Sequence, residues 1–547
     1  MLHNWCFKVT NPIFSFKKLN FSFEIFTDTN RYDIDPDNYE TIVTDDAFKV
    51  VANGLASAGG QIKNKGYIEA TVEYKDGIYS IRVNAKHKEK IRRVKVALFN
   101  EPYGELIARR RYTVKYNEYG KILRYPNGWD DLFTPLVVLK SKEGLRYYRS
   151  LDNVVRPKAF AFTKKGKGST VELVFEEDAR KLRNEITTPV WEVGSISSIE
   201  EIYQKHADFI AQAYKFEKWE ERHDVPSWGR DISLVINMHG MHWSGYIFSD
   251  YKEMENKLTK LASYINPKHT LVYIPGFDGR YYYKYPNYTP CKRMGGVDGF
   301  RHLVEAAHKL GYHVMPMFMI NGANPKTKGF SNWGKCSRYH SSNGYVTGVP
   351  SCDWDTARSY DLGCGVGMNP GSKKWQKHFT DEVAKLLKEV EFDGIFLDLA
   401  AIYLNDPFFS THEGVTQIID KLHEIKPDLL VATEGWYDAL SPYFPLSQCA
   451  GEEKSGGEMI YHDTPYAPLF DTYNRAFGHL CLGDVVDGSN GVFEWGFNNA
   501  EHVLPVRKGL IQTLTIVEKL PDENNKEFKQ LISNIKEYEE RFLKGDK

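Results

Sequence analysis

The sequence predicts an α/β protein, a (β/α)8 TIM barrel preceded by an antiparallel β-sandwich domain. Short alternating runs separated by turn residues fill the first 190 residues or so, whereas apolar strand runs alternate with helical segments from residue 231 onward. No GxGxxG or GxxxxGK[ST] loop occurs, which favours a barrel over a nucleotide-binding open sheet. The expected organisation is a sandwich domain at 1–190, a connecting helix at 191–230, and a barrel at 231–547 with a long loop insertion at about 326–371.

Alternation is clearest in the runs FSFEIF and STVELVFEE of the first domain. The segment EATVEYKDGIYSIRV holds two such runs around Lys75-Asp76-Gly77, and a glycine at this point supplies the positive φ that a tight hairpin needs. We therefore expect an antiparallel hairpin here. Farther along, Ile199, Ile202, Ala207 and Ile210 keep helical spacing after serine residues that can cap a helix, so a connecting helix that packs between the domains is expected.

The barrel half begins with five strand runs that alternate with four helical segments. Strands are expected at 232–240, 270–279, 313–325, 394–400 and 429–436, and helices at 252–265, 297–311, 372–391 and 411–427. Beyond residue 436 the pattern is weaker: 445–451 and 479–485 are plausible sixth and seventh strands, the eighth is not placed, and 507–520 and 525–543 are interpreted as closing helices.

Composition excludes several classes of function. Of 547 residues, 71 are Lys or Arg and 72 are Asp or Glu, a formal charge of −1 that argues against a nucleic-acid or anionic-membrane binder. No run of about 18 apolar residues predicts a transmembrane helix, and no secretory signal is visible, so a cytoplasmic location is expected. Seven cysteines without a CxxC pair argue against a disulfide framework or structural zinc. No cofactor or metal is expected.

Two carboxylates carry the functional prediction. Asp398 ends the apolar run Gly394-Ile395-Phe396-Leu397, and Glu434 ends the next strand. Catalytic groups of such barrels lie at the carboxyl ends of strands, and glycoside hydrolysis needs one carboxylate at the anomeric centre and one acid for the leaving oxygen. The alternative is a structural role, in which both acids cap loops or pair with Arg280 or Arg475.

Other polar and aromatic groups follow the same strand ends. The candidates for substrate binding are His239, Trp243, Asp278, Arg280, Tyr282, Asn321, Trp436 and His462. Aromatic residues make up 14% of the chain and gather in the loops between about 280 and 355. We expect a sugar-stacking wall there, formed by Tyr281, Tyr282, Tyr283, Tyr285, Tyr288, Trp333, Tyr339, Tyr345 and Trp354.

Several segments resemble known enzymes. Met368-Asn369-Pro370, the stretch 372–400 and the run VATEGWYDAL look like the fourth- and fifth-strand motifs of a broad group of barrel glycosidases, which includes the alpha-amylase, alpha-galactosidase and endo-alpha-N-acetylgalactosaminidase families. The resemblance implies that Asp398 is the nucleophile and Glu434 the acid/base. It also places Asn321 at the end of the third strand. Phe396 stands where amylases usually carry an arginine, so the chain is expected to be a divergent member.

A third acid is suggested by the run Tyr461-His462-Asp463-Thr464-Pro465, which resembles the NHDTP motif whose aspartate steadies the transition state. Asp463 is the candidate from this resemblance, with Glu452, Glu453 and Asp484 left as alternatives.

The expected function is hydrolysis of an alpha-linked oligosaccharide or polysaccharide with retention. A transglycosidase on the same fold and a noncatalytic carbohydrate-binding protein remain alternatives. A metal-dependent hydrolase has weaker support because no HExxH occurs, and a serine hydrolase lacks its GxSxG motif. The expected partner is a carbohydrate, with no nucleic acid or membrane; the sugar, the linkage and the oligomeric state are left open.

Overall fold

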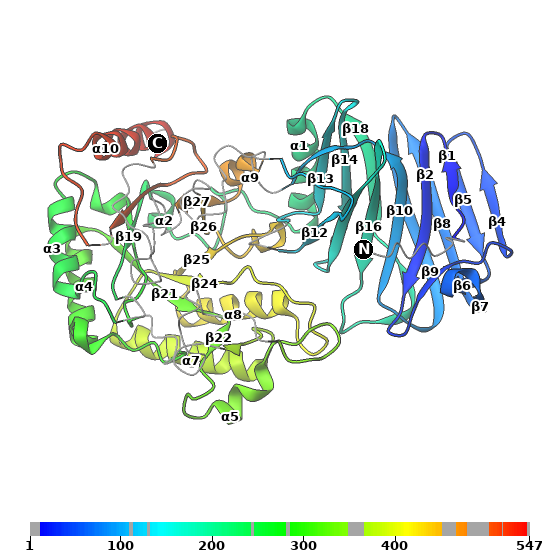
Figure 1. The fold of residues 1–547 in the computed structure, drawn as a ribbon. Helices are drawn as coiled ribbons and strands as arrows, with labels where there is room; N and C mark the ends of the chain where they lie inside the picture. The colour runs from blue at the N-terminus through cyan, green and yellow to red at the C-terminus, as the bar shows by residue number, and fades with distance from the viewer. Residues whose placement is uncertain are drawn as a thin grey trace, which may run out of the picture. The chain divides into compact units, whose positions relative to one another are not determined.

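The computed structural model describes residues 11–108, 113–127, 132–241, 245–279, 285–347, 366–450, 466–478, 503–516 and 518–543. The chain divides into two compact units, Met1–Asn127 with Asp131–Tyr214 and Gly128–Asp130 with Lys215–Lys547. The described part of the first unit is built mainly of antiparallel strands, and that of the second of parallel strands and helices (Figure 1).

Two antiparallel sheets, each of nine strands within the described residues, form the first unit. One sheet runs in the order β12 (Lys121–Tyr125), β15 (Lys158–Lys165), β16 (Gly168–Glu176), β10 (Arg93–Glu101), β2 (Leu19–Phe26), β3 (Arg31–Ile34), β6 (Leu55–Ser57) and β7 (Ile62–Asn64), with β1 (Phe14–Phe16) paired to β2. The other runs β11 (Gly104–Ile107), β13 (Leu136–Ser141), β14 (Gly144–Leu151), β18 (Val190–Ile196), β9 (Ile78–Ile91), β8 (Gly66–Lys75), β5 (Ala47–Ala52) and β4 (Tyr39–Val43), with β17 (Arg183–Thr187) paired to β9.

The two sheets share one hydrophobic core, so the predicted sandwich is confirmed. Phe23 and Val96 from one sheet and Val72 and Val83 from the other are fully buried in it. Val72 and Val83 come from strands whose side chains alternate between the core and the outside, which is the pattern predicted from the sequence. The hairpin of β8 and β9 also forms as predicted, and both of its turn residues have positive φ, 51° at Asp76 and 84° at Gly77.

Helix α1 (Ile199–Ala213) follows the sandwich strands. Its N-cap is Ser198, whose side chain accepts a hydrogen bond from the backbone N–H of Glu201, and it packs against β14 and β18. The expected helix is thus present, and its role as a connector between domains stays a prediction.

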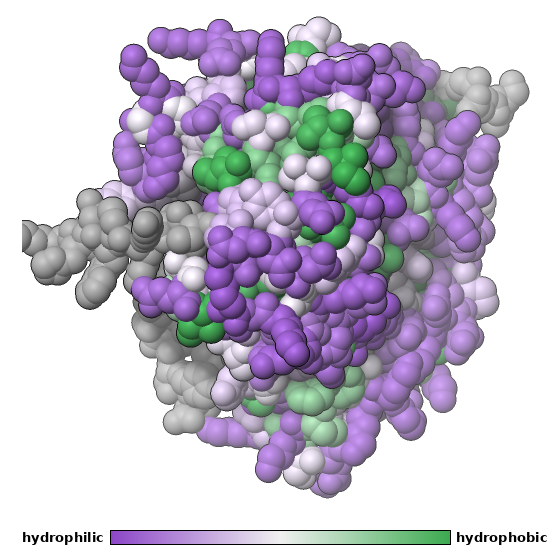
Figure 2. Space-filling view, turned by 90° about the vertical axis from the view of Figure 1, so that its right-hand side faces the viewer, coloured by the Kyte–Doolittle hydropathy of each residue, from purple (hydrophilic) through white to green (hydrophobic). Residues whose placement is uncertain are grey.

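One surface of the sandwich has an exposed edge strand. All five residues of β4 are exposed, including Ile42 and Val43, and Ile62 of β7 is exposed as well. Figure 2 shows the face that carries β4 in Figure 1; it is mostly hydrophilic, with apolar side chains gathered in its upper part.

Eight parallel strands form a nearly closed barrel in the second unit. In order around the barrel they are β27 (Arg475–Gly478), β26 (Leu446–Ala450), β25 (Leu430–Glu434), β24 (Gly394–Asp398), β21 (His313–Met319), β20 (Thr270–Ile274), β19 (Leu234–Met238) and β28 (Gln512–Ile516). The seam between β27 and β28 has a parallel bridge at Ala476 and Leu510. Two backbone hydrogen bonds hold it: Ala476 N–H donates to Gly509 O at 2.8 Å, and Ile511 N–H donates to Ala476 O at 2.9 Å.

Helices lie between successive strands. The described ones are α2 (Ser227–Arg230), α3 (Tyr251–Leu261), α4 (Gly296–Leu310), α5 (Phe330–Trp333), α7 (Lys373–Glu389), α8 (Thr411–Ile425), α9 (Ala467–Thr472) and α10 (Lys526–Tyr538). Short 3-10 turns lie at Ala58–Gly60, Pro267–His269, Lys292–Met294, Lys335–Ser337 and Asp438–Leu440, a π-helical turn ends α10 at Glu539–Leu543, and β22 (Gly322–Ala323) pairs with β23 (Val366–Gly367).

The first six strands and the helices predicted at 252–265, 297–311, 372–391, 411–427 and 525–543 are confirmed. Most of them show the signals used: α3, for example, starts with a capping box of Asp250 and Glu253. The segment 479–485, predicted as the seventh strand, lies outside the described residues, and β27 lies just before it. The helix predicted at 507–520 is wrong, because this segment contains β28. All five residues of β28 are buried, so the alternation that identifies a strand is absent.

No helix among the described residues combines the length and the apolar composition that crossing a bilayer requires.

Candidate active site

The two predicted catalytic acids lie side by side at the carboxyl ends of neighbouring strands. Asp398 is the last residue of β24 and Glu434 the last residue of β25. The two strands pair in parallel with Leu397 opposite Thr433, one residue before each acid. Both acids are almost fully buried, with 5% of Asp398 and 3% of Glu434 exposed. A pair of buried carboxylates on adjacent strands is therefore present at this end of the barrel.

The direction of both side chains follows from strand alternation. Phe396 on β24 and Ala432 on β25 belong to the hydrophobic core inside the barrel. Residues two apart on a strand point to the same face, so Asp398 and Glu434 point to the barrel axis above this core. In parallel barrels this end carries the loops that form active sites.

The backbone turns sharply after each acid. Leu399 has φ 58° and Gly435 has φ 74°, both in the left-handed region. For a leucine this conformation is strained, and such strain gathers at functional sites. It turns the Leu399 N–H to donate to Glu434 Oε2 at 3.3 Å, and the Leu399 carbonyl accepts from Asn321 Nδ2 at 2.8 Å. The turn thus ties the strand ends of both acids and Asn321 together.

Asp278 belongs to the same end of the barrel. It follows β20 and is 5% exposed. Burial raises the pKa of the Tyr288 hydroxyl well above its usual range, and the carboxylates of Asp278 and Asp398 raise it further. Both carboxylates therefore lie within electrostatic reach of one buried phenol, whose hydroxyl donates to Met319 O at 2.7 Å.

His239 and Trp436 are both buried near their strand ends. His239 follows β19; its N–H donates to Ile516 O at 3.0 Å, and its ring meets the ring of Phe248 edge-on at 5.6 Å. Trp436 has no exposed surface, its indole N–H donates to Ser441 Oγ at 2.9 Å, and its ring lies 5.2 Å from that of Phe470. The contact of Trp436 with Ser441 packs the loop after β25. The substrate roles of both residues stay predictions.

Five predicted site residues lie outside the described residues, namely Trp243, Arg280, Tyr282, His462 and Asp463. The same holds for the alternative third acids Glu452, Glu453 and Asp484.

The sugar-stacking wall is wrong for three of its described members. Tyr285, Tyr288 and Tyr339 are buried, at most 3% exposed, so they are not the open ring faces that a stacking wall in a loop requires. Tyr288 packs on Phe318 of β21 at 4.7 Å between ring centroids, which is a core contact. The rings of Tyr285 and Tyr288 pack onto the barrel because burying a large aromatic ring is more favourable in free energy than leaving it in water.

Two buried amides at this end are not among the residues predicted from the sequence. Gln448 on β26 is paired with Glu434, and Asn237 lies on β19 with its Nδ2 donating to Thr515 Oγ1 at 3.0 Å. Neither has any exposed surface. A polar residue two positions after an apolar core residue of a strand is the signal that could have found them: Leu446 precedes Gln448, and Val235 precedes Asn237.

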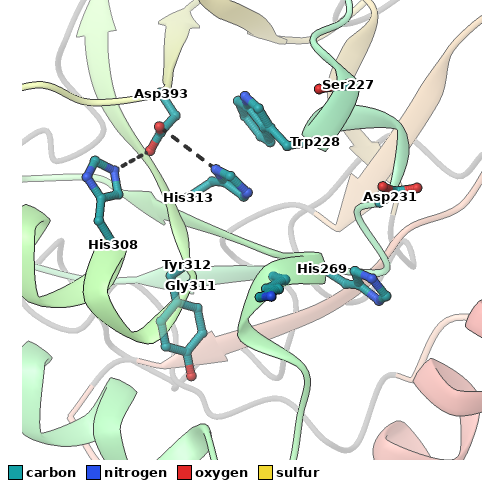
Figure 3. A pocket seen from close by; sticks show the side chains of 10 residues that line it. Ser227, Trp228, Asp231, His269, His308, Gly311, Tyr312, His313 and Asp393 are labelled. Carbon is teal, nitrogen blue, oxygen red and sulfur yellow. Dashed lines mark hydrogen bonds and ion pairs between the residues drawn. The ribbon is translucent and has the colours of Figure 1, made fainter.

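The opposite end of the barrel holds a cavity of about 630 Å³ with a different character (Figure 3). Asp393, just before β24, accepts hydrogen bonds from His308 Nε2 and from the Val314 N–H, both at 2.8 Å. His313 Nδ1 lies 3.8 Å from Asp393 Oδ1, and its ring stacks on Trp228 at 4.0 Å.

The carboxylate of Asp393 is balanced by two histidines of this cavity, His308 and His313. Burial raises the pKa of Asp393, but the hydrogen bond from His308 and the neighbouring His313 outweigh it and bring the pKa down to about 2. The same bond to Asp393 raises the pKa of His308. The cavity lies at the amino ends of the strands, where conserved architecture serves stability rather than chemistry in barrel enzymes.

Among the described residues, no group of three or more His, Cys, Asp or Glu side chains is placed to hold a metal ion.

The comparisons with known proteins concern the domain and the fold. Residues 196–414 match the model of a domain of unknown function, DUF6259. No curated protein matches the chain. Among solved structures, the α-N-acetylgalactosaminidase NagBb from Bifidobacterium bifidum in complex with GalNAc is similar at 12% identity and a TM-score of 0.60, over 81% of this chain and 77% of that one.

Two α-galactosidase structures are also similar. The GH36 α-galactosidase AgaA from Geobacillus stearothermophilus has 11% identity and a TM-score of 0.51 over 95% of this chain and 75% of its own. The galactosidase domain of the α-galactosidase–sucrose kinase AgaSK has 14% identity and a TM-score of 0.52 over 96% and 72%. At such identities the likeness shows the fold, and this chain therefore has a sandwich and barrel fold similar to that of these glycoside hydrolases.

Proposed function

We propose that the protein is a glycoside hydrolase that cleaves an alpha-linked oligosaccharide or polysaccharide with retention of configuration. The observation that carries the proposal is the pair of buried carboxylates, Asp398 and Glu434, at adjacent strand ends and pointing to the barrel axis. Two carboxyl groups that flank one bond are the machinery of glycoside hydrolysis. The alpha linkage is supported by the similar fold of an α-N-acetylgalactosaminidase and of an α-galactosidase domain.

In the proposed mechanism, Asp398 attacks the anomeric carbon while Glu434 protonates the leaving oxygen. The bond between the anomeric carbon and that oxygen breaks, and a glycosyl ester on Asp398 forms. Glu434, now ionised, takes a proton from water, which attacks the same carbon and releases Asp398. The Leu399 N–H bond to Glu434 Oε2 would hold this carboxyl group in place through both steps.

The surrounding polar groups fit a sugar. His239, Asp278 and Asn321 are buried at the same end of the barrel as the acids, after β19, β20 and β21. We assign them to hydroxyl groups of the substrate, which need both donors and acceptors. Asp463 stays a candidate for the third acid, on the sequence resemblance alone.

The first test is turnover of 4-nitrophenyl α-glycosides by the wild-type protein and by Asp398→Asn. Loss of the nucleophile should lower kcat by more than about 1,000-fold while the thermal unfolding midpoint stays close to that of the wild type. Asp393→Asn is the matched control, because it changes an aspartate just before the same strand but at the opposite end of the barrel. Near-full activity of Asp398→Asn would exclude the assignment.

Stereochemistry is tested by proton NMR of the first product. Retention gives the alpha anomer before mutarotation, whereas a beta product would make the enzyme inverting.

Product analysis separates the two alternative functions. A transglycosidase would give transfer products in the presence of an acceptor sugar. A noncatalytic binding protein would bind the sugar without releasing nitrophenol.

A further inference from the structure

Three amide side chains at the catalytic end of the barrel keep polar atoms without a hydrogen-bond partner. They are Gln448, with neither Oε1 nor Nε2 paired, Asn237, with Oδ1 unpaired, and Asn321, with Oδ1 unpaired. Their exposed fractions are 0%, 0% and 1%. Burying an unpaired amide atom costs free energy, so buried amides in native proteins normally have partners. A binding site is a place where such atoms are kept for a ligand.

Gln448 has the largest unused capacity and the closest link to the catalytic pair. It lies directly opposite Glu434 in the pairing of β25 with β26. Leu446, two residues earlier, belongs to the core inside the barrel, so Gln448 also points inward, at the level of Glu434. Its neighbour Ser447 is fully buried with an unpaired Oγ too, but it points to the other face of the strand.

The orientation of the two asparagines shows what kind of group is missing. Asn237 Nδ2 donates to Thr515 Oγ1 and to Gly478 O, on the strand next to β26, and Asn321 Nδ2 donates to Leu399 O. With their N–H groups engaged, both residues offer an acceptor oxygen. Gln448 adds one acceptor and two donor hydrogens. Neutral hydroxyl groups, which donate and accept at once, complement this set.

We infer that Gln448 is a substrate-binding residue that selects the sugar at the catalytic pair by bonding two neighbouring hydroxyl groups of its ring. The inference rests on the proposed function, since it places that ring between Asp398 and Glu434. Asn237 and Asn321 accept from further hydroxyl groups of the same unit. A carboxamide can donate to one hydroxyl oxygen and accept from the adjacent hydroxyl, which fixes the ring orientation.

The test compares Gln448→Met with the wild type on 4-nitrophenyl α-galactoside, α-glucoside and N-acetyl-α-galactosaminide and on their monodeoxy derivatives. Methionine has a similar volume and no amide. On the substrate that the wild type prefers, kcat/KM should fall by about 10- to 100-fold, because a site built for a hydroxyl rejects changes that leave a group unpaired.

The deoxy derivatives distinguish binding from packing. The wild type should lose activity on the derivative that lacks the bonded hydroxyl, whereas Gln448→Met should lose nothing further on that derivative. A purely structural role would lower activity equally on every derivative, and that outcome would overturn the inference. Ser447→Ala is the matched control: it also removes an unpaired buried polar atom of β26, and it should leave kcat/KM unchanged.

Thermal unfolding supplies an independent readout. Gln448→Met and Ser447→Ala should both unfold at the wild-type temperature or above it, because each removes a buried polar atom that has no partner.

Failure of the inference can be told from failure of the proposed function. If the wild type turns over a substrate and Gln448→Met has full kcat/KM on every derivative, only the role of Gln448 is wrong. If the wild type turns over nothing, calorimetry with galactose, glucose and N-acetylgalactosamine decides. Binding by the wild type but not by Gln448→Met would keep the role of Gln448 and reject hydrolysis, and an absence of binding by the wild type would reject both.

Discussion

Strand β24 has an aspartate at each end, and the two lie in opposite surroundings. Asp393, just before the strand, is held by His308 and the Val314 N–H, with His313 beside it. Asp398, at the end of the strand, has a second acid, Glu434, on the neighbouring strand. The carboxylates of Asp398 and Asp278 both lie within electrostatic reach of the buried Tyr288 hydroxyl.

The difference separates stability from function. At the amino end an acid meets bases, so the charges satisfy one another within the protein. At the carboxyl end Asp398 and Glu434 lie on neighbouring strands, and the buried amides Gln448 and Asn237 keep unpaired atoms. Unpaired buried amide atoms are unfavourable for the folded protein alone and indicate a ligand that completes them. Substitutions at the amino end should therefore change mainly stability, and substitutions at the carboxyl end mainly activity.

The largest loss of activity is expected for Glu434→Gln. Loss of the general acid and base should lower kcat on an unactivated α-linked disaccharide by about 100- to 10,000-fold. The loss should be smaller on 4-nitrophenyl substrates, whose leaving group needs little protonation. Azide, a small anionic nucleophile that needs no base, should restore turnover and give an α-glycosyl azide, detected by NMR. Equal losses on both substrate types, without rescue, would show that Glu434 is not the acid.

At the amino end, Asp393→Asn should lower the free energy of unfolding by about 2 kcal/mol, since the pKa of Asp393 falls from 3.8 to about 2 on folding. The contribution of Asp393 is complete above pH 4 or so and is lost as the pH falls towards 2. The contribution of His308, whose pKa is raised, is complete below about pH 6.5 and is lost as the pH rises through its folded value.

The stability difference between the wild type and Asp393→Asn should therefore be largest between about pH 4 and 6.5, measured by urea unfolding across pH. Asp381→Asn is the control, because Asp381 pairs with Lys377 on an exposed helix surface and should change little. A difference that does not vary with pH would contradict the ion-pair explanation, and a loss of kcat in Asp393→Asn would break the separation of the two ends.

The smallest effect is expected for Gly435→Ala. An alanine at φ 74° should cost about 1 kcal/mol of stability. The same change at Gly77, where φ is 84° and an added Cβ meets nothing within 4 Å, should cost a similar amount. Only Gly435→Ala should also lower kcat/KM, because Gly435 follows Glu434 directly. Similar activity in both variants would show that the turn after β25 does not position the acid.

The parts of the fold that sequence patterns predicted are those in which one signal was unambiguous. The first five barrel strands are short apolar runs followed by helical segments, and the acids Asp398 and Glu434 close two of them. The segment containing β28 failed because a strand buried on both faces has no alternation, so its leucines and isoleucines also fit a helix.

Residues of the site could be predicted from the sequence only where a reactive residue type stood at the end of a predicted strand. An acid at the end of an apolar strand is conspicuous, whereas Gln448 is one neutral residue within a strand. Its importance depends on its register with Glu434 and on the lack of a partner, and neither can be read from the sequence. The aromatic loop misled for the opposite reason: Tyr285 and Tyr288 stand in a polar segment, yet they pack into the core because the fold places that loop over β21 and α7.

The seam between β27 and β28 has a consequence for how the barrel opens. Strand β24 is bonded along both edges, to β21 and to β25. Among the described residues, β27 is joined to Gly509 and Ile511, just before β28, by two backbone bonds, and to β28 itself by the Gly478 N–H donation to Thr513 Oγ1 at 2.7 Å. Amide hydrogens of β24 should therefore exchange with solvent only in global unfolding, and those of β27 in a smaller, more frequent opening. A sugar that bonds Gln448, on the strand beside β27, would slow that local exchange, and the seam would report occupancy of the site without any turnover.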